Sequence, residues 1–229
     1  MKIRKISIAS VVFVVALAMM QMVAFGTPID SMNDRPVTVN SSGSNGEPTL
    51  QSLLNILYPG QVNVNTDQSP FGMWGSSSGS GQNIAPNLEF TYAGNATSNI
   101  IGIWSGTDTS NIVPVNVFIG APAGTVASLT WHADGSLEIF PGNSASVPYI
   151  NATTVNGIDP SRFGFFLAST ATSNTFYSVD DLNSDEAHVL AFNATGNDWV
   201  LAFEDLPFGS ADQDYNDEVL KVESIRGAG

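Results

Sequence analysis

The chain has 229 residues, of which 21 are acidic and 7 are basic, and it contains no cysteine. Nucleic acids and anionic membrane surfaces bind proteins through basic patches, so the formal charge of −14 argues against both as partners. The lack of cysteine excludes disulfides, thiol catalysis and zinc–thiolate sites.

Residues 1–26 have the pattern of a secretory signal peptide. Three basic residues among the first five precede a mostly apolar stretch that ends at Ala24 and Gly26, and small residues at this position are typical of a cleavage site. We therefore expect cleavage before Thr27 and a secreted protein, located outside the cell or at the cell surface. An uncleaved signal would instead act as a membrane anchor. No later apolar stretch reaches the roughly 20 residues of a spanning helix, so we expect no membrane span after cleavage.

The chain that remains after cleavage is strongly and unevenly acidic. It has four basic and 21 acidic residues, a formal charge of −17, and 12 of the acidic residues lie within the last fifty positions. This asymmetry indicates that cations bind near the C-terminal end. Residues 27–48 are rich in Asn, Ser, Gly and Pro, and we expect them to form a flexible lead-in.

Two features follow in the next part of the chain. Leucines recur at helical spacing within residues 47–57 and a Pro-Gly pair ends the run, so we expect one short helix or turn. Residues 69–81 form a loop rich in glycine and serine. Its residues Phe71, Met73 and Trp74 could form an exposed platform for a sugar or a protein. We favour Trp74 packed against the flank of the domain, because single aromatic residues usually cover a core.

The rest of the chain predicts short strands that are rich in β-branched and aromatic residues and bounded by turn residues. Their expected ranges are 88–92, 100–104, 113–119, 126–131, 163–168, 188–192, 199–203 and 219–225. Strands of this number and spacing favour an all-β fold, an antiparallel two-sheet β-sandwich with jelly-roll-like connections rather than a barrel. We therefore expect a single domain over residues 49–229 that ends in an acidic hairpin.

The loop of this last hairpin concentrates oxygen ligands. Calcium takes six to eight oxygens from carboxylates, amides and backbone carbonyls. Two carboxylates about 4 Å apart repel by roughly 4 kcal/mol at an effective dielectric constant near 20, so crowded carboxylates favour a bound cation. The predicted metal ligands are Glu204, Asp205, Asp212, Asp214, Asn216 and Asp217.

The arrangement of these ligands depends on strand pairing. If strands 199–203 and 219–225 pair, Asp205 and Asp217 face each other at the base of the loop, and its tip is lined by Asp212, Asp214 and Asn216. The alternative is a solvated acidic hairpin in which the aspartates serve as turn formers. Turn chemistry accounts for two or three aspartates, so we expect calcium as the bound cofactor.

The same residues resemble a known family. The run 199–206 (Trp-Val-Leu-Ala-Phe-Glu-Asp-Leu), Gly209 and the run 212–217 (Asp-Gln-Asp-Tyr-Asn-Asp) are similar to the signature of domain-of-unknown-function family 4114, found in exported bacterial proteins. Residues 163–167 and 176–178 also resemble that family, and the likeness in pattern covers 100–225. The resemblance implies an extracellular β-rich calcium-binding module with no known enzymatic activity.

Catalysis has little support in the sequence. His132 and His188 are the two histidines, so a Ser-His-Asp triad would need one of them, with Asp134 or Asp185 as its acid. No Gly-x-Ser-x-Gly motif accompanies either histidine. We expect no enzymatic activity and no catalytic residues. A hydrolase would require one of the histidines to lie in an exposed cleft beside a carboxylate.

The sequence therefore predicts an exported, non-catalytic, calcium-binding β-sandwich module with a structural or adhesive role at the cell envelope or in the extracellular matrix. Glycans or proteins of the envelope or matrix would be its further partners. The alternative is a carbohydrate-binding module, which needs two or three aromatic side chains on one exposed face. The candidates for that face are Trp74, Trp104, Trp131 and Tyr149.

Overall fold

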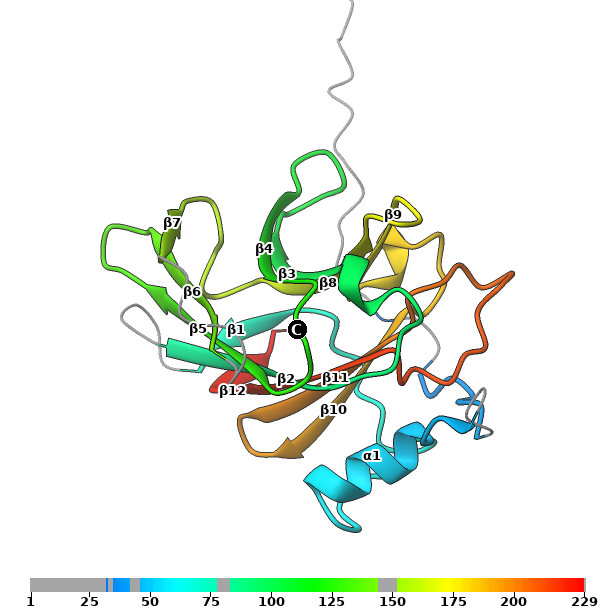
Figure 1. The fold of residues 1–229 in the computed structure, drawn as a ribbon. Helices are drawn as coiled ribbons and strands as arrows, with labels where there is room; N and C mark the ends of the chain where they lie inside the picture. The colour runs from blue at the N-terminus through cyan, green and yellow to red at the C-terminus, as the bar shows by residue number, and fades with distance from the viewer. Residues whose placement is uncertain (1–31, 33–34, 42–45, 78–82, 144–151, 229) are drawn as a thin grey trace, which may run out of the picture.

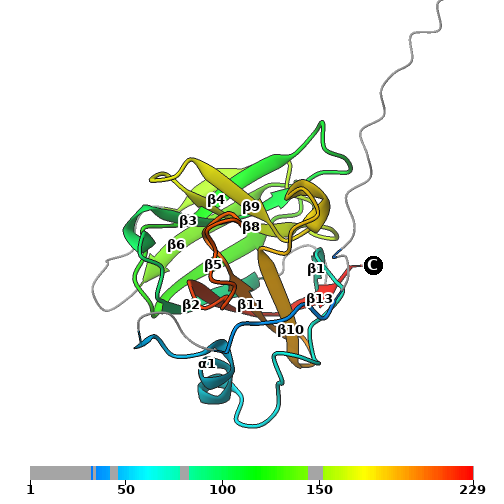
Figure 2. The ribbon, with the colours of Figure 1, turned by 90° about the vertical axis from the view of Figure 1, so that its right-hand side faces the viewer.

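The computed structural model describes residues 32, 35–41, 46–77, 83–143 and 152–228. The predicted signal peptide and Tyr149 lie outside these ranges. The described residues form mainly antiparallel strands, which pack as two larger sheets face to face (Figures 1 and 2). This confirms the predicted all-β sandwich. Within the described ranges, no helix is both long enough and apolar enough to cross a bilayer.

The elements have the following bounds: α1, Leu50–Leu57; β1, Trp74–Ser76; β2, Asn83–Thr91; η2, Ala96–Ser98; β3, Asn99–Ser105; β4, Val113–Ile119; β5, Thr125–Trp131; β6, Leu137–Asn143; β7, Thr153–Val155; β8, Gly164–Ser169; β9, Asn174–Tyr177; η3, Asp180–Leu182; β10, Val189–Thr195; β11, Asp198–Phe203; β12, Glu218–Glu223; β13, Ile225–Gly227. The large sheet has the order β10-β11-β12-β2-β5-β6-β7, and the small sheet has the order β4-β3-β8-β9. Strands β1 and β13 pair separately.

Strand β11 lies between two apolar layers. Its odd-numbered residues, such as Trp199 and Phe203, belong to the core between the two sheets. Its even-numbered residues, Val200 and Ala202, belong to a second apolar cluster with α1 on the outer face of the sheet. Because successive side chains of a strand point to opposite faces, a strand that is buried on both faces has a continuous apolar sequence.

Helix α1 forms where the leucine spacing predicts it. Thr49 caps its N-terminus by accepting a hydrogen bond from the Ser52 backbone N–H, and Leu50, Leu53 and Leu54 are fully buried. These leucines pack on β10, β11 and β12 (Figure 1). Burial of each leucine contributes about 1.5–3 kcal/mol, so the helix holds these strands from outside the sandwich.

The predicted strand 219–225 is interrupted in the structure. Ser224 has a left-handed backbone with φ of 67°, which ends β12 and redirects the chain into β13. Strand β13 then pairs with β1, whose residues lie in the segment that was expected to be a loop. Trp74 at the start of β1 is fully buried. Its ring packs edge to face against the ring of Trp199, with the two ring centroids 5.7 Å apart. The packed orientation that we favoured for Trp74 is therefore confirmed.

Residues 35–41 belong to the stretch that was expected to be a flexible lead-in, but they make specific contacts. Arg35 forms a buried bidentate ion pair with Asp180, with N–O distances of 2.8 and 2.9 Å. The backbone of Val37 exchanges two hydrogen bonds of 2.8 Å with the side chain of Gln68, and Val39 is buried. This part of the lead-in is therefore packed onto the domain.

Candidate metal site

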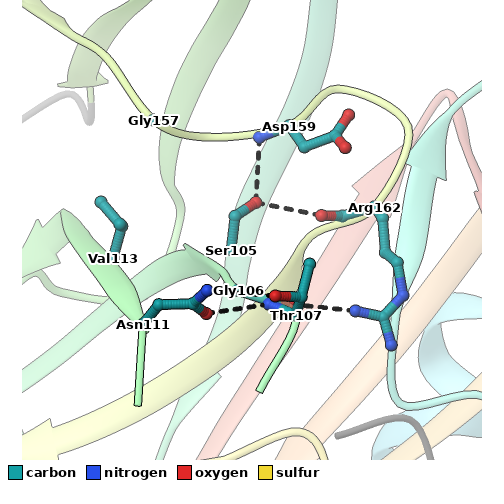
Figure 3. A pocket seen from close by; sticks show the side chains of 8 residues that line it. All are labelled: Ser105, Gly106, Thr107, Asn111, Val113, Gly157, Asp159 and Arg162. Atoms are coloured by element: carbon teal, nitrogen blue, oxygen red, sulfur yellow. Dashed lines mark hydrogen bonds between the residues drawn. The ribbon is translucent and has the colours of Figure 1, made fainter. Parts of the chain in front are cut away.

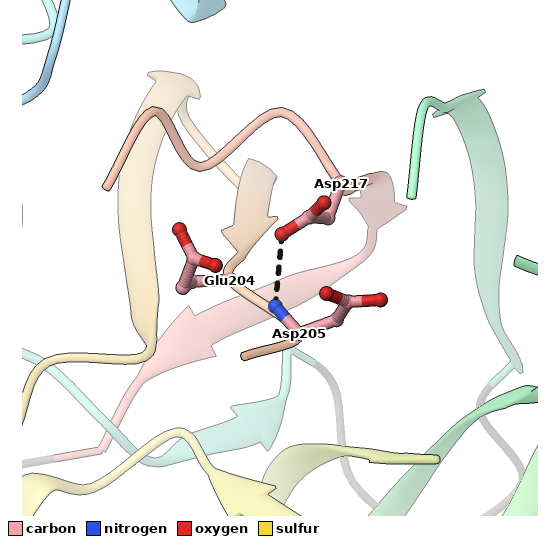
Figure 4. Close-up of side chains that lie close together, drawn as sticks. All are labelled: Glu204, Asp205 and Asp217. Atoms are coloured by element: carbon pink, nitrogen blue, oxygen red, sulfur yellow. Dashed lines mark hydrogen bonds between the residues drawn. The ribbon is translucent and has the colours of Figure 1, made fainter. Parts of the chain in front are cut away.

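Strands β11 and β12 form the hairpin that the ligand prediction requires. They pair antiparallel, with Phe203 opposite Glu218 at the end where the loop begins and ends. Glu204 and Asp205 follow β11, and Asp217 precedes β12. The backbone N–H of Asp205 donates a 2.9 Å hydrogen bond to Oδ2 of Asp217 (Figure 4). The two predicted ligands at the base of the loop therefore meet as expected.

The loop brings carboxylates into two overlapping groups. Oxygens of Glu204, Asp205 and Asp217 lie within 4.8 Å of one another, and so do oxygens of Glu204, Asp212 and Asp214. Glu204 belongs to both groups. Five of the six predicted ligands are thus close enough to share cations, and Glu204 lies at the centre.

The sixth predicted ligand, Asn216, lies beside them and is fully buried. Its amide nitrogen donates hydrogen bonds of 2.9 Å to Oδ2 of Asp214 and to the carbonyl oxygen of Pro48. Its amide oxygen has no hydrogen-bond partner in the described part of the chain. A buried amide oxygen without a partner is costly, and it is a ligand type that calcium accepts.

Negative charge in the loop is buried without a balancing cation. Glu204 is 1% exposed, Asp205 is 3% exposed and Glu218 is 2% exposed. Among the described residues, none of these three carboxylates, nor that of Asp217, forms an ion pair with Lys, Arg or His. Burying a carboxylate costs several kcal/mol unless a partner compensates it.

The pKa values reflect this environment. Burial, and then the charges of Asp217 and Asp212, raise the pKa of Glu204 to about 9. Burial and the charge of Asp205 raise the pKa of Asp217 to about 7. Each shift is a preference for the protonated form, so the folded loop disfavours its own negative charge.

The backbone of the loop is strained and anchored. Gln213 and Tyr215 have left-handed φ values of 59° and 54°, a conformation that costs about 1–2 kcal/mol per residue with a side chain. The Gln213 N–H donates to Oε2 of Glu204 at 3.0 Å, and the buried Tyr215 hydroxyl donates to the carbonyl oxygen of Ala187 at 2.7 Å. These anchors hold the loop closed over its carboxylates.

Sequence reasoning missed a polar network behind the site. Glu218 accepts hydrogen bonds from the Thr91 hydroxyl at 2.7 Å and from the Asn99 amide at 3.1 Å, and Asn99 also donates to Asp205 at 3.2 Å. Burial raises the pKa of Glu218 to about 8. One feature of the sequence could have predicted this network: Glu218, an acidic residue, begins an apolar strand directly after Asp217.

A hollow of about 230 Å³ opens beside the carboxylates. Glu47, which precedes α1, and Tyr92, which follows β2, contribute to its wall together with the loop. The residues that line it are Glu47, Tyr92, Gly94, Asn95, Glu204, Asp205, Leu206, Ser210, Asp212 and Asp217. The carboxylates are therefore reachable from solvent through this hollow.

The structure places the two histidines in different environments. His188 is buried and stacks on Phe176 with ring centroids 3.7 Å apart, and burial lowers its pKa. His132 is exposed, and its Nε2 lies 3.3 Å from Oε2 of Glu138. Burial of His188 removes it as an exposed general base.

The aromatic face required for carbohydrate binding is not formed by the candidates in the described ranges. Trp74, Trp104 and Trp131 are all fully buried, and Tyr149 lies outside those ranges. The indole N–H groups of Trp104 and Trp131 donate to backbone carbonyl oxygens inside the domain. These three tryptophans are core residues.

A larger hollow of about 360 Å³ lies at the end of the small sheet, near the β3–β4 connection (Figure 3). Its polar groups bond one another: the Ser105 hydroxyl accepts from the Asp159 N–H and donates to the Arg162 carbonyl oxygen. Asn111 accepts from the Thr107 N–H in the same loop. These contacts hold the connections at the sheet end together.

Residues 158–225 match the model of a domain of unknown function, DUF4114. The match includes strands β8 to β12 and the complete acidic loop, and it confirms the resemblance over that segment but does not reach back to residue 100. No curated protein and no solved structure shows a significant match to the chain.

Proposed function

We propose that this chain, in which residues 158–225 form a DUF4114 domain, is an exported, non-catalytic module that binds calcium at its acidic loop. Its role would be structural or adhesive, at the cell envelope or in the extracellular matrix. One observation carries the proposal: two groups of carboxylate oxygens, each within 4.8 Å, share the buried Glu204. A divalent cation between them would remove the repulsion that their burial creates.

The donor set supports calcium over other metals. The clustered ligands are oxygens of Asp and Glu side chains, with the Asn216 amide oxygen beside them. Zinc and copper sites in proteins are built mainly from cysteine and histidine, whereas calcium accepts six to eight oxygens in a flexible geometry. Magnesium usually retains several waters and takes one or two carboxylates. A set of five carboxylates fits calcium best.

Binding would stabilise the closed hairpin. A ligand that binds the native state alone adds about 2.7 kcal/mol at a hundredfold excess over its Kd, a large part of the stability of one domain. The cation would offset the repulsion among the carboxylates and the strained φ values of Gln213 and Tyr215. Extracellular calcium modules commonly have Kd values of about 10⁻⁴ to 10⁻³ M, which suits an exported protein.

The test compares thermal melting of residues 27–229 in chelator and in millimolar calcium. We expect calcium to raise Tm by several degrees in the wild type and not in the double variant Asp212→Ala, Asp214→Ala. The matched control is Asp108→Ala, Asp134→Ala, which removes the same charge from two exposed turns. The control should keep the calcium response. Equal wild-type melts in both buffers, or a response that survives in the Asp212→Ala, Asp214→Ala variant, would contradict the proposal.

A further inference from the structure

The N-terminal strap, which we define as residues 35–41, crosses from the buried ion pair to the acidic loop. At one end, Arg35 binds Asp180 and also donates to the carbonyl oxygen of Val189 at 3.1 Å. At the other end, Asn40 forms two hydrogen bonds with the loop. The strap therefore connects a fixed point of the domain with the candidate metal site.

Asn40 contacts the loop backbone through two hydrogen bonds. Its side-chain amide donates to the carbonyl oxygen of Asp212 at 3.1 Å, and its backbone N–H donates to the carbonyl oxygen of Gln213 at 2.9 Å. Asp212 is a predicted cation ligand, and Gln213 is one of the two residues with a left-handed backbone. Asn40 thus contacts the part of the loop whose conformation decides where the carboxylates of Asp212 and Asp214 lie.

The segment that follows the strap approaches the same site. Glu47 lines the hollow beside the carboxylates, and the carbonyl oxygen of Pro48 accepts the amide of Asn216 at 2.9 Å. The N-terminal segment therefore contacts the acidic loop at two places, near the tip of the loop at Asp212 and near the end of the loop at Asn216. Both contacts are made with the loop in the closed conformation that the structure shows.

Repulsion links these contacts to the cation. Without a cation, the carboxylates of Glu204, Asp205 and Asp217, whose oxygens lie within 4.8 Å of one another, repel each other and favour an open loop. An open loop moves the carbonyl oxygens of Asp212 and Gln213 away from Asn40. A cation that closes the loop would restore both hydrogen bonds, so the strap should be fixed in the cation-bound state.

We propose that Asn40 is a positioning residue of the cation site: the strap holds the acidic loop closed, and the cation and the strap stabilise each other. This inference rests on the proposed calcium-binding function. Coupling between two sites is reciprocal, so calcium tightens the strap to the extent that the strap raises calcium affinity. Asn40 acts through the loop backbone and is not itself a ligand.

The test measures calcium affinity by isothermal titration calorimetry, and amide hydrogen exchange in residues 35–41, on the chain 27–229. Asn40→Ala should weaken calcium binding about threefold to tenfold, the effect of one hydrogen bond. In chelator the substitution should lower Tm less than it does in calcium, because repulsion among the carboxylates weakens the closed loop that makes the contact. The matched control is Asn193→Ala, which removes a similar bond of 3.2 Å from an exposed side chain to the Gly196 carbonyl oxygen. Calcium should slow exchange at 35–41 in the wild type.

The outcomes separate the two proposals. If the wild type binds calcium but Asn40→Ala binds it equally well, the strap inference is wrong and the calcium site stands. The inference is also wrong if Asn40→Ala lowers Tm equally in chelator and in calcium, since that is the effect of a purely structural contact. The strap inference is wrong as well if calcium leaves the rate of amide hydrogen exchange in residues 35–41 unchanged. If the wild type binds no calcium, both proposals fail.

Discussion

Two buried acidic regions of this molecule differ in whether a cationic side chain balances them. Asp180 has its cation within the chain, since Arg35 binds it with two hydrogen bonds and both side chains are 3% exposed or less. Glu204 and its neighbours in the loop have no such partner among the described residues. The first region is complete as folded. The second is a cluster of carboxylates that lie within 4.8 Å of one another.

If the loop binds an ion as proposed, the two regions differ in how they respond to their surroundings. An internal ion pair is present whenever the protein is folded, so it does not respond to the concentration of an ion in the surrounding solution. A group of carboxylates that depends on an external ion responds to the concentration of that ion. The experiments below alter the two regions one at a time.

The largest effect is expected for Arg35→Ala. Removing one partner of a buried ion pair leaves Asp180 as an uncompensated charge, which typically costs about 3–5 kcal/mol. The measurement is the free energy of unfolding in urea. The control, Arg226→Ala, removes an exposed arginine and should change stability by less than about 0.5 kcal/mol.

Replacing both partners sharpens this result. Arg35→Met combined with Asp180→Leu removes both charges and should recover part of the loss. A double variant that is less stable than Arg35→Ala alone would show that the ion pair matters for reasons other than charge balance.

The next largest effect is a pH dependence of the calcium-free protein. The pKa values of Glu204 and Glu218 are raised in the folded state to about 9 and about 8, so the folded loop holds protons that the unfolded chain has released. Stability from such groups is present below their unfolded pKa and is lost as pH rises through the folded pKa. In chelator, Tm should therefore fall by several degrees between pH 7 and pH 9.

Calcium should suppress this fall, because the bound cation replaces the protons. The pKa of His188 is lowered by burial, so its effect on stability lies below this pH window. The variant Glu204→Gln should show a flatter profile in chelator. A wild-type Tm that stays constant from pH 7 to pH 9 in chelator would argue against buried ionisable carboxylates.

The smallest effect is expected for Asp217→Asn at pH 8. The new amide oxygen can still accept the Asp205 N–H, while the charge that repels Asp205 is lost. Stability in chelator should rise by about 1 kcal/mol, and the gain on adding calcium should shrink. Urea unfolding in both buffers measures the two quantities. The same substitution in an exposed turn, Asp134→Asn, should give no such rise, because its charge faces solvent. A destabilised Asp217→Asn protein in chelator would count against repulsion in the loop.

Local signals in the sequence were enough to predict much of the candidate site. The ligands from Glu204 to Asp217 lie within one loop, and the flanking apolar runs indicate the hairpin that brings its two ends together. The spacing of the leucines in α1 likewise predicts a helix. In each case the interacting residues are near neighbours in the chain.

The parts that were missed depend on contacts between distant segments. Arg35 and Asp180 are 145 positions apart, and Asn99 reaches Glu218 across 119 positions. A polar residue gives no sign of a partner at that distance. Strand β9 has only four residues, too few to show a clear pattern in the sequence, and its pairing with β8 gives it the strand conformation.

The position of β12 has a consequence for folding kinetics. This strand lies between β11 and β2 and joins the β10-β11 hairpin to the rest of the large sheet. Its register places Glu218 opposite Thr91, so closing the sheet requires contacts between segments more than a hundred residues apart. Such contacts form slowly. Since the acidic loop leads directly into β12, an ion that closes the loop would favour the insertion of the strand that completes the sheet.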